Sequence, residues 1–168
     1  RAHGVHHAQH RSHDTEGRQA ARQALQRGHG GVLFASGNEN SGLTLFVQDD
    51  RLVFDYNCFG EHHAAESTVA LPVGASSLGV RFARSGRGAT ATLVVDGEAV
   101  GSVDVPFAMF IMSSIGPSVG YDHGSAVSER YDAPFAFEGT LHRVDIQLAA
   151  RRSRKGDAAD ERAAMAQQ

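Results

Sequence analysis

Short apolar runs separated by turn residues dominate the chain from Gly31 onward. Apolar and polar residues alternate within several runs, as in Leu43 to Val47 and in Val144 to Leu148, and this alternation is typical of strands that bury one face. The runs recur about every ten residues, which is the spacing found in sandwiches and barrels. Other runs lie at 32–36, 52–56, 67–71, 78–83, 93–95, 98–105 and 107–111. The pattern predicts an all-β fold of two antiparallel sheets packed face to face.

Two of the expected hairpins have two-residue turns. Asp96-Gly97 lies between the runs 93–95 and 98–105, and this dipeptide favours a tight turn because Gly accepts positive φ. Asp49-Asp50 separates the runs 43–47 and 52–56. Asp visits positive φ more readily than most residues, so a second hairpin is predicted there.

The two ends of the chain lack this pattern. Residues 1–30 are rich in His, Arg, Gln, Ala and Gly, so we expect a disordered or weakly helical lead, with Glu16 to Arg27 as a short marginal helix. Residues 31–149 are predicted to form the sandwich. Residues 150–168 are expected to be a basic, polar, flexible tail.

Composition limits the possible classes of function. A chain of 168 residues with 41% hydrophobic residues suits one domain, and no apolar run approaches the roughly 20 residues that cross a bilayer. Residues 32–148 hold six Arg and fourteen acidic residues, 6 − 14 = −8, which argues against nucleic-acid binding by the folded part. The chain starts at Arg1 without a signal-like segment, so we interpret it as a piece of a longer protein and favour a cytoplasmic location.

Histidine and cysteine offer two candidate sites. His3, His6, His7, His10 and His13 recur at helix-like spacing, which is compatible with a metal site or with an adventitious ion-binding tail. Cys58 precedes His62 and His63, and these residues are compatible with a Cys/His nucleophile pair or with an ordinary loop thiol. Because no oxyanion-stabilising element or third ligand stands at a recognisable spacing, we expect neither a catalytic nor a metal site in this chain.

The densest polar loop spans residues 120–132. Its three carboxylates, hydroxyls and Gly carbonyls are compatible with a calcium cage, or with Asx-type turns in which Asp122 and Ser128 bind backbone amides. We favour the turns. Loops at the ends of sandwiches often carry binding, so a docking surface is predicted at Tyr121, Asp122, Gly124, Ser125, Ser128 and Tyr131.

The same loop and its flanks resemble the C-terminal domain of bacterial arylsulfatases of the actinobacterial type. That family has the pattern G-x-D-x-G-S-x-V-S-x-x-Y, then P-F-x-F-x-G-T and a closing strand. The matching residues here are Gly120, Asp122, Gly124, Ser125, Val127, Ser128 and Tyr131, then Pro134, Phe135, Phe137, Gly139, Thr140 and Val144 to Leu148. Segments 31–37, 45–57 and 93–97 are similar to the family's earlier strands, so the resemblance covers about residues 31–148.

The resemblance implies a concanavalin-like, jelly-roll β-sandwich attached to an α/β catalytic domain that hydrolyses sulfate esters. Formylglycine and calcium are then expected only in that absent domain, and none in this chain. Cys58 is followed by Phe59, Gly60, Glu61 and His62 and lacks the neighbours of a formylglycine site. The family usually opens with an alternating strand that begins Arg-Ser-His-Thr, whereas Asp14 to Arg27 lacks alternation after Arg11-Ser12-His13. Either the first strand is lost or the chain is a degenerate fragment.

These observations favour a non-catalytic accessory domain whose partner is the catalytic sulfatase domain of the parent chain. The alternative is a lectin-like module that binds glycans or sulfate esters, although the chain has no Trp and an aromatic fraction of 7%, and sugar platforms generally need exposed aromatic faces. A third hypothesis, a small hydrolase, depends on Cys58, His62 and His63.

Overall fold

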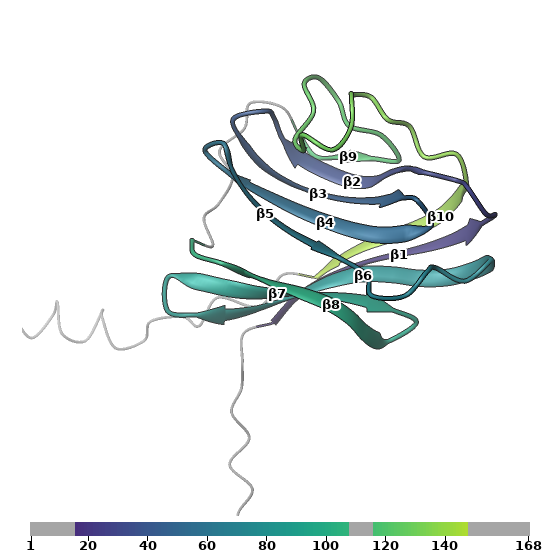
Figure 1. The fold of residues 1–168 in the computed structure, drawn as a ribbon, viewed down its shortest axis with the longest axis horizontal. Helices are drawn as coiled ribbons and strands as arrows, with labels where there is room; N and C mark the ends of the chain where they lie inside the picture. The colour runs from purple at the N-terminus through teal and green to yellow at the C-terminus, as the bar shows by residue number, and fades with distance from the viewer. Residues whose placement is uncertain (1–15, 108–115, 148–168) are drawn as a thin grey trace, which may run out of the picture.

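The computed structural model of the chain describes residues 16–107 and 116–147. These residues form ten strands arranged as two five-stranded antiparallel sheets that pack face to face (Figure 1). They contain no helix that is long and apolar enough to cross a lipid bilayer. The predicted all-β sandwich of two antiparallel sheets is therefore confirmed.

Sheet A has the strand order β10-β1-β6-β7-β8. Strand β1 lies between β6 and β10 and pairs with both. Strands β6, β7 and β8 follow one another as hairpins. The strands are β1 (Glu16–Leu25), β6 (Gly74–Ser85), β7 (Gly88–Val95), β8 (Glu98–Val105) and β10 (Thr140–Gln147).

Sheet B has the order β5-β4-β3-β2-β9. Four consecutive strands form a meander, and the short β9 adds to its edge beside β2. The strands are β2 (Gly31–Gly37), β3 (Ser41–Gln48), β4 (Arg51–Cys58), β5 (Glu61–Glu66) and β9 (Ser118–Val119).

Both predicted two-residue turns are present. Asp49 and Asp50 have φ of 52° and 58° between β3 and β4, and Asp96 and Gly97 have φ of 49° and 93° between β7 and β8. Two successive residues at positive φ match the right-handed twist of the flanking strands. The turns thus hold the hairpins in the register that places alternate residues inside the sandwich.

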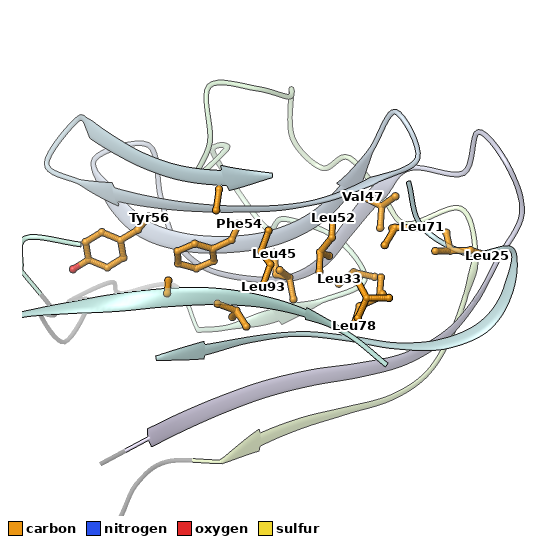
Figure 2. Close-up of a cluster of buried hydrophobic side chains, with 14 of the residues drawn as sticks. Leu25, Leu33, Leu45, Val47, Leu52, Phe54, Tyr56, Leu71, Leu78 and Leu93 are labelled. Carbon is orange, nitrogen blue, oxygen red and sulfur yellow. The ribbon is translucent and has the colours of Figure 1, made fainter. Parts of the chain in front are cut away.

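The main core lies between the two sheets. Figure 2 shows side chains from sheet B meeting Leu78 and Leu93 of sheet A, with Leu25 and Leu71 toward one end. Phe54 also packs edge-to-face on Phe82, with ring centroids 5.4 Å apart. Burial of these alternate positions accounts for the strand pattern of the sequence.

One prediction about the start of the chain is wrong. Residues Glu16–Leu25 form strand β1 rather than a weak helix, so the sandwich begins near residue 16 instead of 31. Pairing explains the difference: β1 matches β6 at ten consecutive positions and β10 at seven. Helix propensities differ by only tenths of a kcal/mol per residue, and ladder hydrogen bonds on both sides outweigh them. The first strand is present rather than lost.

Two further strand assignments change. The run 67–71 is a loop, and the strand before it is β5. Phe107 lies outside any strand, and 108–111 fall outside the described residues. The remaining predictions for residues 1–15 and 148–168 also fall outside the described part of the chain.

Candidate functional site

The segment 120–139, which we call the roof, packs on the outer face of sheet B (Figure 1). The covered face presents Val32 and Phe46 from β2 and β3, and both are fully buried. From the roof, Val127 is also fully buried, and the rings of Tyr131 and Phe135 stack with centroids 5.1 Å apart. Sheet B is therefore sandwiched between two apolar layers, which is why β4 is buried on both faces.

Backbone contacts bind the roof to β2. The Val32 amide donates to the Phe135 carbonyl at 2.9 Å, and the Gly120 amide donates to the Leu33 carbonyl at 3.1 Å. Gly31 has φ +119°, and a Cβ there would lie 2.3 Å from Cα of Phe137. Only Gly allows the chain to approach this closely.

Asp122 joins the two ends of the loop. This residue is 2% exposed, and its Oδ2 accepts hydrogen bonds from the Val127 amide at 2.9 Å and from the Tyr131 hydroxyl at 2.6 Å. The Tyr131 oxygen also lies 3.1 Å from Oγ1 of Thr44, which is buried on β3. Asp122 thereby joins two parts of the loop and, through Tyr131, attaches the loop to sheet B.

The electrostatics around Tyr131 follow from this geometry. Burial raises the pKa of the Tyr131 phenol above its ordinary value of 10.0, and the hydrogen bond to Asp122 raises it further. Both causes disfavour the phenolate. Tyr131 is therefore a neutral donor to a carboxylate at physiological pH, which suits a structural hydrogen bond.

Asp55 makes a second polar connection. Its carboxylate is 2% exposed, and Oδ2 accepts a 2.5 Å hydrogen bond from Ser128 Oγ and lies 2.9 Å from His62 Nδ1. His62 Nε2 lies 3.8 Å from a carboxylate oxygen of Glu129. Among the described residues, Asp55 Oδ1 has no hydrogen-bond partner. The connection links β4, β5 and the roof.

This group contains a Ser, a His and an Asp, but not in the geometry of a hydrolase. A nucleophilic serine must meet the histidine, which in turn meets the carboxylate. Here Ser128 and His62 both meet the same oxygen of Asp55, and Ser128 is buried. The arrangement is suited to holding the roof in place.

Asn57 extends the attachment to the end of the sandwich. Its Nδ2 donates to the carbonyl oxygens of Glu39 and Val127, and its Oδ1 accepts from the Gly60 amide at 2.8 Å. Ser125 Oγ accepts from the Glu39 amide at 3.4 Å. Two hairpin turns and the roof are therefore joined into one rigid end.

The six predicted docking residues divide into two groups. Tyr121, Gly124 and Ser125 are exposed, and the Tyr121 ring meets His123 edge-on at 6.1 Å. The others are buried or half-buried: Asp122, Ser128 and Tyr131. Ser128 Oγ also accepts from the Arg130 amide two residues on, so its predicted turn is confirmed. Asp122 binds a backbone amide as predicted, but that of Val127 five residues on, which closes a wider loop than an Asx turn.

The structure separates one of the two proposed histidines from Cys58. Cys58 packs against the inter-sheet core, whereas His62 lies on the opposite face of sheet B beside Asp55. His63 is the register partner of Tyr56 and so lies on the same face as Cys58, and its Nε2 is buried without a hydrogen-bond partner in the described residues. Within 16–107 and 116–147, no three or more His, Cys, Asp or Glu side chains gather as for a metal ion. The histidines of residues 3–13 lie outside these ranges.

The roles of Asp55, Asn57, His62 and Thr44 were not predicted from the sequence. One signal was available: Asp55 interrupts the apolar positions of 52–56, and a carboxylate in such a run needs donors from another segment. The sequence could not identify those donors, because Ser128 is 73 positions away.

Comparison with known proteins places the fold. No protein-family model and no curated protein sequence matches the chain. The domains LG4-5 of the mouse laminin α1 chain superpose with a TM-score of 0.56 at 13% identity, over 86% of this chain and 39% of that one. The chain is a concanavalin-like β-sandwich. It spans about two-fifths of the laminin chain that it matches. A heptameric SAP-like pentraxin from Limulus polyphemus gives a TM-score of 0.42 at 11% identity, over 82% of this chain and 66% of the pentraxin chain.

Proposed function

We propose that the chain is a non-catalytic accessory domain that packs beside the catalytic domain of an arylsulfatase-type sulfuric ester hydrolase. This proposal rests on the contacts that the polar residues of the arylsulfatase-like motif make in the structure. Its polar residues Asp122, Ser128 and Tyr131 are engaged in hydrogen bonds within the domain. Polar groups that hydrogen-bond within the domain keep the loop in place and are not directed at a substrate. The motif therefore supports an accessory role and not a catalytic one.

The burial of the reactive groups argues in the same direction. Catalysis needs a nucleophile and a base that face a bound substrate, but Ser128 of the roof and Asp55 of β4 are buried against each other. A shallow hollow, open to solvent, lies among Leu25, Arg27, Leu71 and Val73, and its lining contains no nucleophile paired with a base. The chemistry is therefore assigned to the partner domain, together with its formylglycine and calcium.

The exposed part of the roof is the surface we assign to docking. Tyr121 is 43% exposed and His123 and Ser125 lie beside it in sequence, while Asp122 anchors the loop from beneath. A mobile loop loses conformational entropy when it docks, and this loss weakens binding. A loop that is already fixed loses little freedom on binding, which favours it as a contact to a catalytic domain.

The test has a genetic and a biochemical arm. The reading frame upstream of this segment should encode a formylglycine motif, with Cys or Ser followed by Pro or Ala at the second position and by Arg at the fourth. The catalytic domain that it encodes should bind the 168-residue chain in analytical ultracentrifugation. A Tyr121→Ala variant should weaken this binding, whereas Thr92→Ala on sheet A should leave it unchanged.

A direct assay addresses catalysis. The purified chain should release no nitrophenol from 4-nitrophenyl sulfate, and neither should Cys58→Ser nor Ser128→Ala. Turnover that disappears in either variant would overturn the proposal, as would an upstream frame without the motif.

The exposed aromatic residue Tyr121 also favours a second candidate, a lectin-like module. Aromatic faces bind sugar rings, although the chain has no Trp. Binding to a neutral glycan array that disappears in Tyr121→Ala and persists in Thr92→Ala would favour this function over docking.

A further inference from the structure

The two ends of the sandwich differ in how the edges of its sheets are covered. Strands β5 and β8 are the edge strands at one end, and β9 and β10 are those at the other (Figure 1). At the first end, the amide and the hydroxyl of Thr68 both donate to the Val100 carbonyl of β8, at 2.7 and 3.0 Å. Because Thr68 follows β5, this contact joins the two sheets and covers the edge of β8.

Strand β10 forms the opposite edge of sheet A, and its edge is open. Among the described strands it pairs only with β1, and its backbone makes no hydrogen bond to any other described segment. About half of the N–H and C=O groups of an edge strand point away from its one partner. Such groups are a template on which a further strand can add.

Apolar side chains of β10 are also incompletely covered. Leu141 and Val144 pack against the inter-sheet core, yet both are only half-buried. Ile146 lies on the same face as Val144, because alternate residues of a strand share a face, and it is 46% exposed. A strand added at this edge would remove apolar surface from water.

The charges of β10 are arranged in an unusual way for an open edge. Charged side chains commonly protect such an edge from a second strand. Here two charges of opposite sign stand two positions apart, and Arg143 Nε donates to both carboxylate oxygens of Asp145 at 2.8 and 2.7 Å. An identical strand that runs antiparallel can therefore place each charge opposite its complement.

Symmetry limits the registers in which two copies of β10 can pair. A two-fold axis pairs residues that are equally far from it along the two strands. With the axis at Val144, Arg143 lies opposite Asp145 of the second copy, and Asp145 lies opposite Arg143 of that copy. An axis at Arg143 or at Asp145 places two like charges opposite each other, which destabilises a sheet. The charges thus favour the axis at Val144.

The regular part of β10 suits this register. Its pairing with β1 shifts between Leu141 and Arg143 and is unbroken from Arg143 to Gln147. The three central positions of the symmetric pair, 143–145, lie inside this unbroken part. Ile146 of one copy then lies opposite His142 of the other, where the irregularity begins. The ladder is short, so we expect a weak and reversible dimer rather than an obligate one.

We propose that β10 is a dimerisation edge, at which two copies of this chain pair antiparallel with the two-fold axis at Val144 and join their A sheets into one continuous sheet. Backbone hydrogen bonds supply the affinity, and the two pairs of Arg143 with Asp145 across the axis select the register. The partner is a second copy of the chain. This inference therefore goes beyond the proposed function and needs no sulfatase domain.

Sedimentation equilibrium of the 168-residue chain measures the association. The average mass should rise from 17.9 kDa toward twice that value between low micromolar and submillimolar concentrations. Hydrogen–deuterium exchange should become slower in 140–147 at the higher concentration, because edge amides then gain partners. A monomer over the whole range, or slower exchange confined to other strands, would overturn the proposal.

Charge reversal tests the register. Arg143→Asp brings carboxylates opposite each other across the axis, and Asp145→Arg brings guanidinium groups opposite each other, so each change should weaken association about tenfold. An equimolar mixture of the two variants should associate nearly as tightly as the parent chain, because opposite charges meet again in the mixed dimer. The double variant with both changes in one chain should also dimerise like the parent chain.

Two further variants separate this register from general charge repulsion. Arg87→Asp in the exposed β6–β7 turn and Asp132→Arg in an exposed part of the roof make the same changes in net charge. Both should leave the association within about twofold. Equal weakening by these controls and by the β10 variants would overturn the proposal, and so would a mixture or a double variant that does not recover association.

Discussion

The outer faces of the two sheets differ in how they accommodate charge. At sheet B, Asp55 of β4 and Asp122 of the roof are both buried, and each accepts a hydrogen bond from a roof side chain. On sheet A, Arg81 and Arg143 lie on a face that no described segment covers. Both sheets have five strands and share one core, so the difference comes from the roof and not from the sheets themselves.

The difference separates stability from recognition. A buried carboxylate contributes to stability only when donors meet it, and loss of a donor leaves it unpaired in a medium of low dielectric. An exposed arginine interacts with water and salt, so its loss changes stability little. Substitutions of the buried residues beneath or within the roof should therefore change stability strongly, whereas substitutions of exposed residues on sheet A should change it little.

The largest expected effect is that of Phe46→Ala. Phe46 is fully buried under the roof, where its ring meets Tyr131 at 5.0 Å and Phe135 at 6.3 Å. Its truncation should lower the free energy of unfolding by about 3–5 kcal/mol, because a cavity remains where the ring was. Urea denaturation followed by circular dichroism measures this.

The matched control for Phe46→Ala lies on the other outer face. Thr92 is half-buried on β7 opposite Arg81, and Thr92→Ala should change the free energy of unfolding by no more than about 0.5 kcal/mol. Equal losses in the two variants would mean that the roof adds nothing to the stability of sheet B.

Local features of the sequence were enough to predict most of the fold. The turns at Asp49-Asp50 and Asp96-Gly97 depend on the φ preferences of two residues each, and they were predicted correctly. The strand over 43–47 was also predicted correctly, but not the burial of both its faces, because the roof that covers the outer face comes from residues 120–139. Strand β1 was not predicted, since Ala, Gln and Arg favour helix locally and the ladders that overrule them come from residues 74–83 and 140–147.

The candidate site was predicted only in part for the same reason. Asp122 and Ser128 each bind a backbone amide within five positions. The sequence indicated such local bonds, although only that of Ser128 has the predicted spacing of a turn. The contact of Ser128 with Asp55, and the register of Arg22 with Arg143, join segments far apart along the chain. Such contacts depend on the packing of whole elements, which periodicity alone does not specify.

A smaller effect is expected for Tyr131→Phe. This change keeps the ring but removes the hydroxyl that donates to Asp122 and meets Thr44. A buried carboxylate and a buried hydroxyl then each lose a partner, so the free energy of unfolding at neutral pH should fall by about 1–3 kcal/mol. A change below about 0.5 kcal/mol would contradict the structural role of this hydrogen bond.

The pH dependence of the same pair gives a second readout. Burial and the Asp122 hydrogen bond raise the pKa of Tyr131 above 10.0 in the folded state, so above this pH the unfolded chain loses the phenolic proton first. The stability contributed by this group is therefore complete below pH 10 and is lost as pH rises. The loss is at most about 1.4 kcal/mol per pH unit, reduced by solvent because the ring is half-buried. Tyr131→Phe should lack this component, so the two stability curves should converge above pH 10.

The smallest expected effect distinguishes two arginines on sheet A. In the described part of the chain, Arg81 donates one 3.3 Å hydrogen bond to the Gly97 carbonyl, whereas Arg143 Nε donates to both oxygens of Asp145. Arg143→Gln removes an exposed ion pair and should lower the free energy of unfolding by about 0.2–0.5 kcal/mol. Arg81→Gln removes no ion pair with a described residue, so its effect should be closer to zero. Urea denaturation at low and at high salt measures both, and the loss in Arg143→Gln should shrink at high salt because screening already weakens the ion pair. A loss in Arg143→Gln that does not change with salt would mean that the ion pair with Asp145 is not its cause.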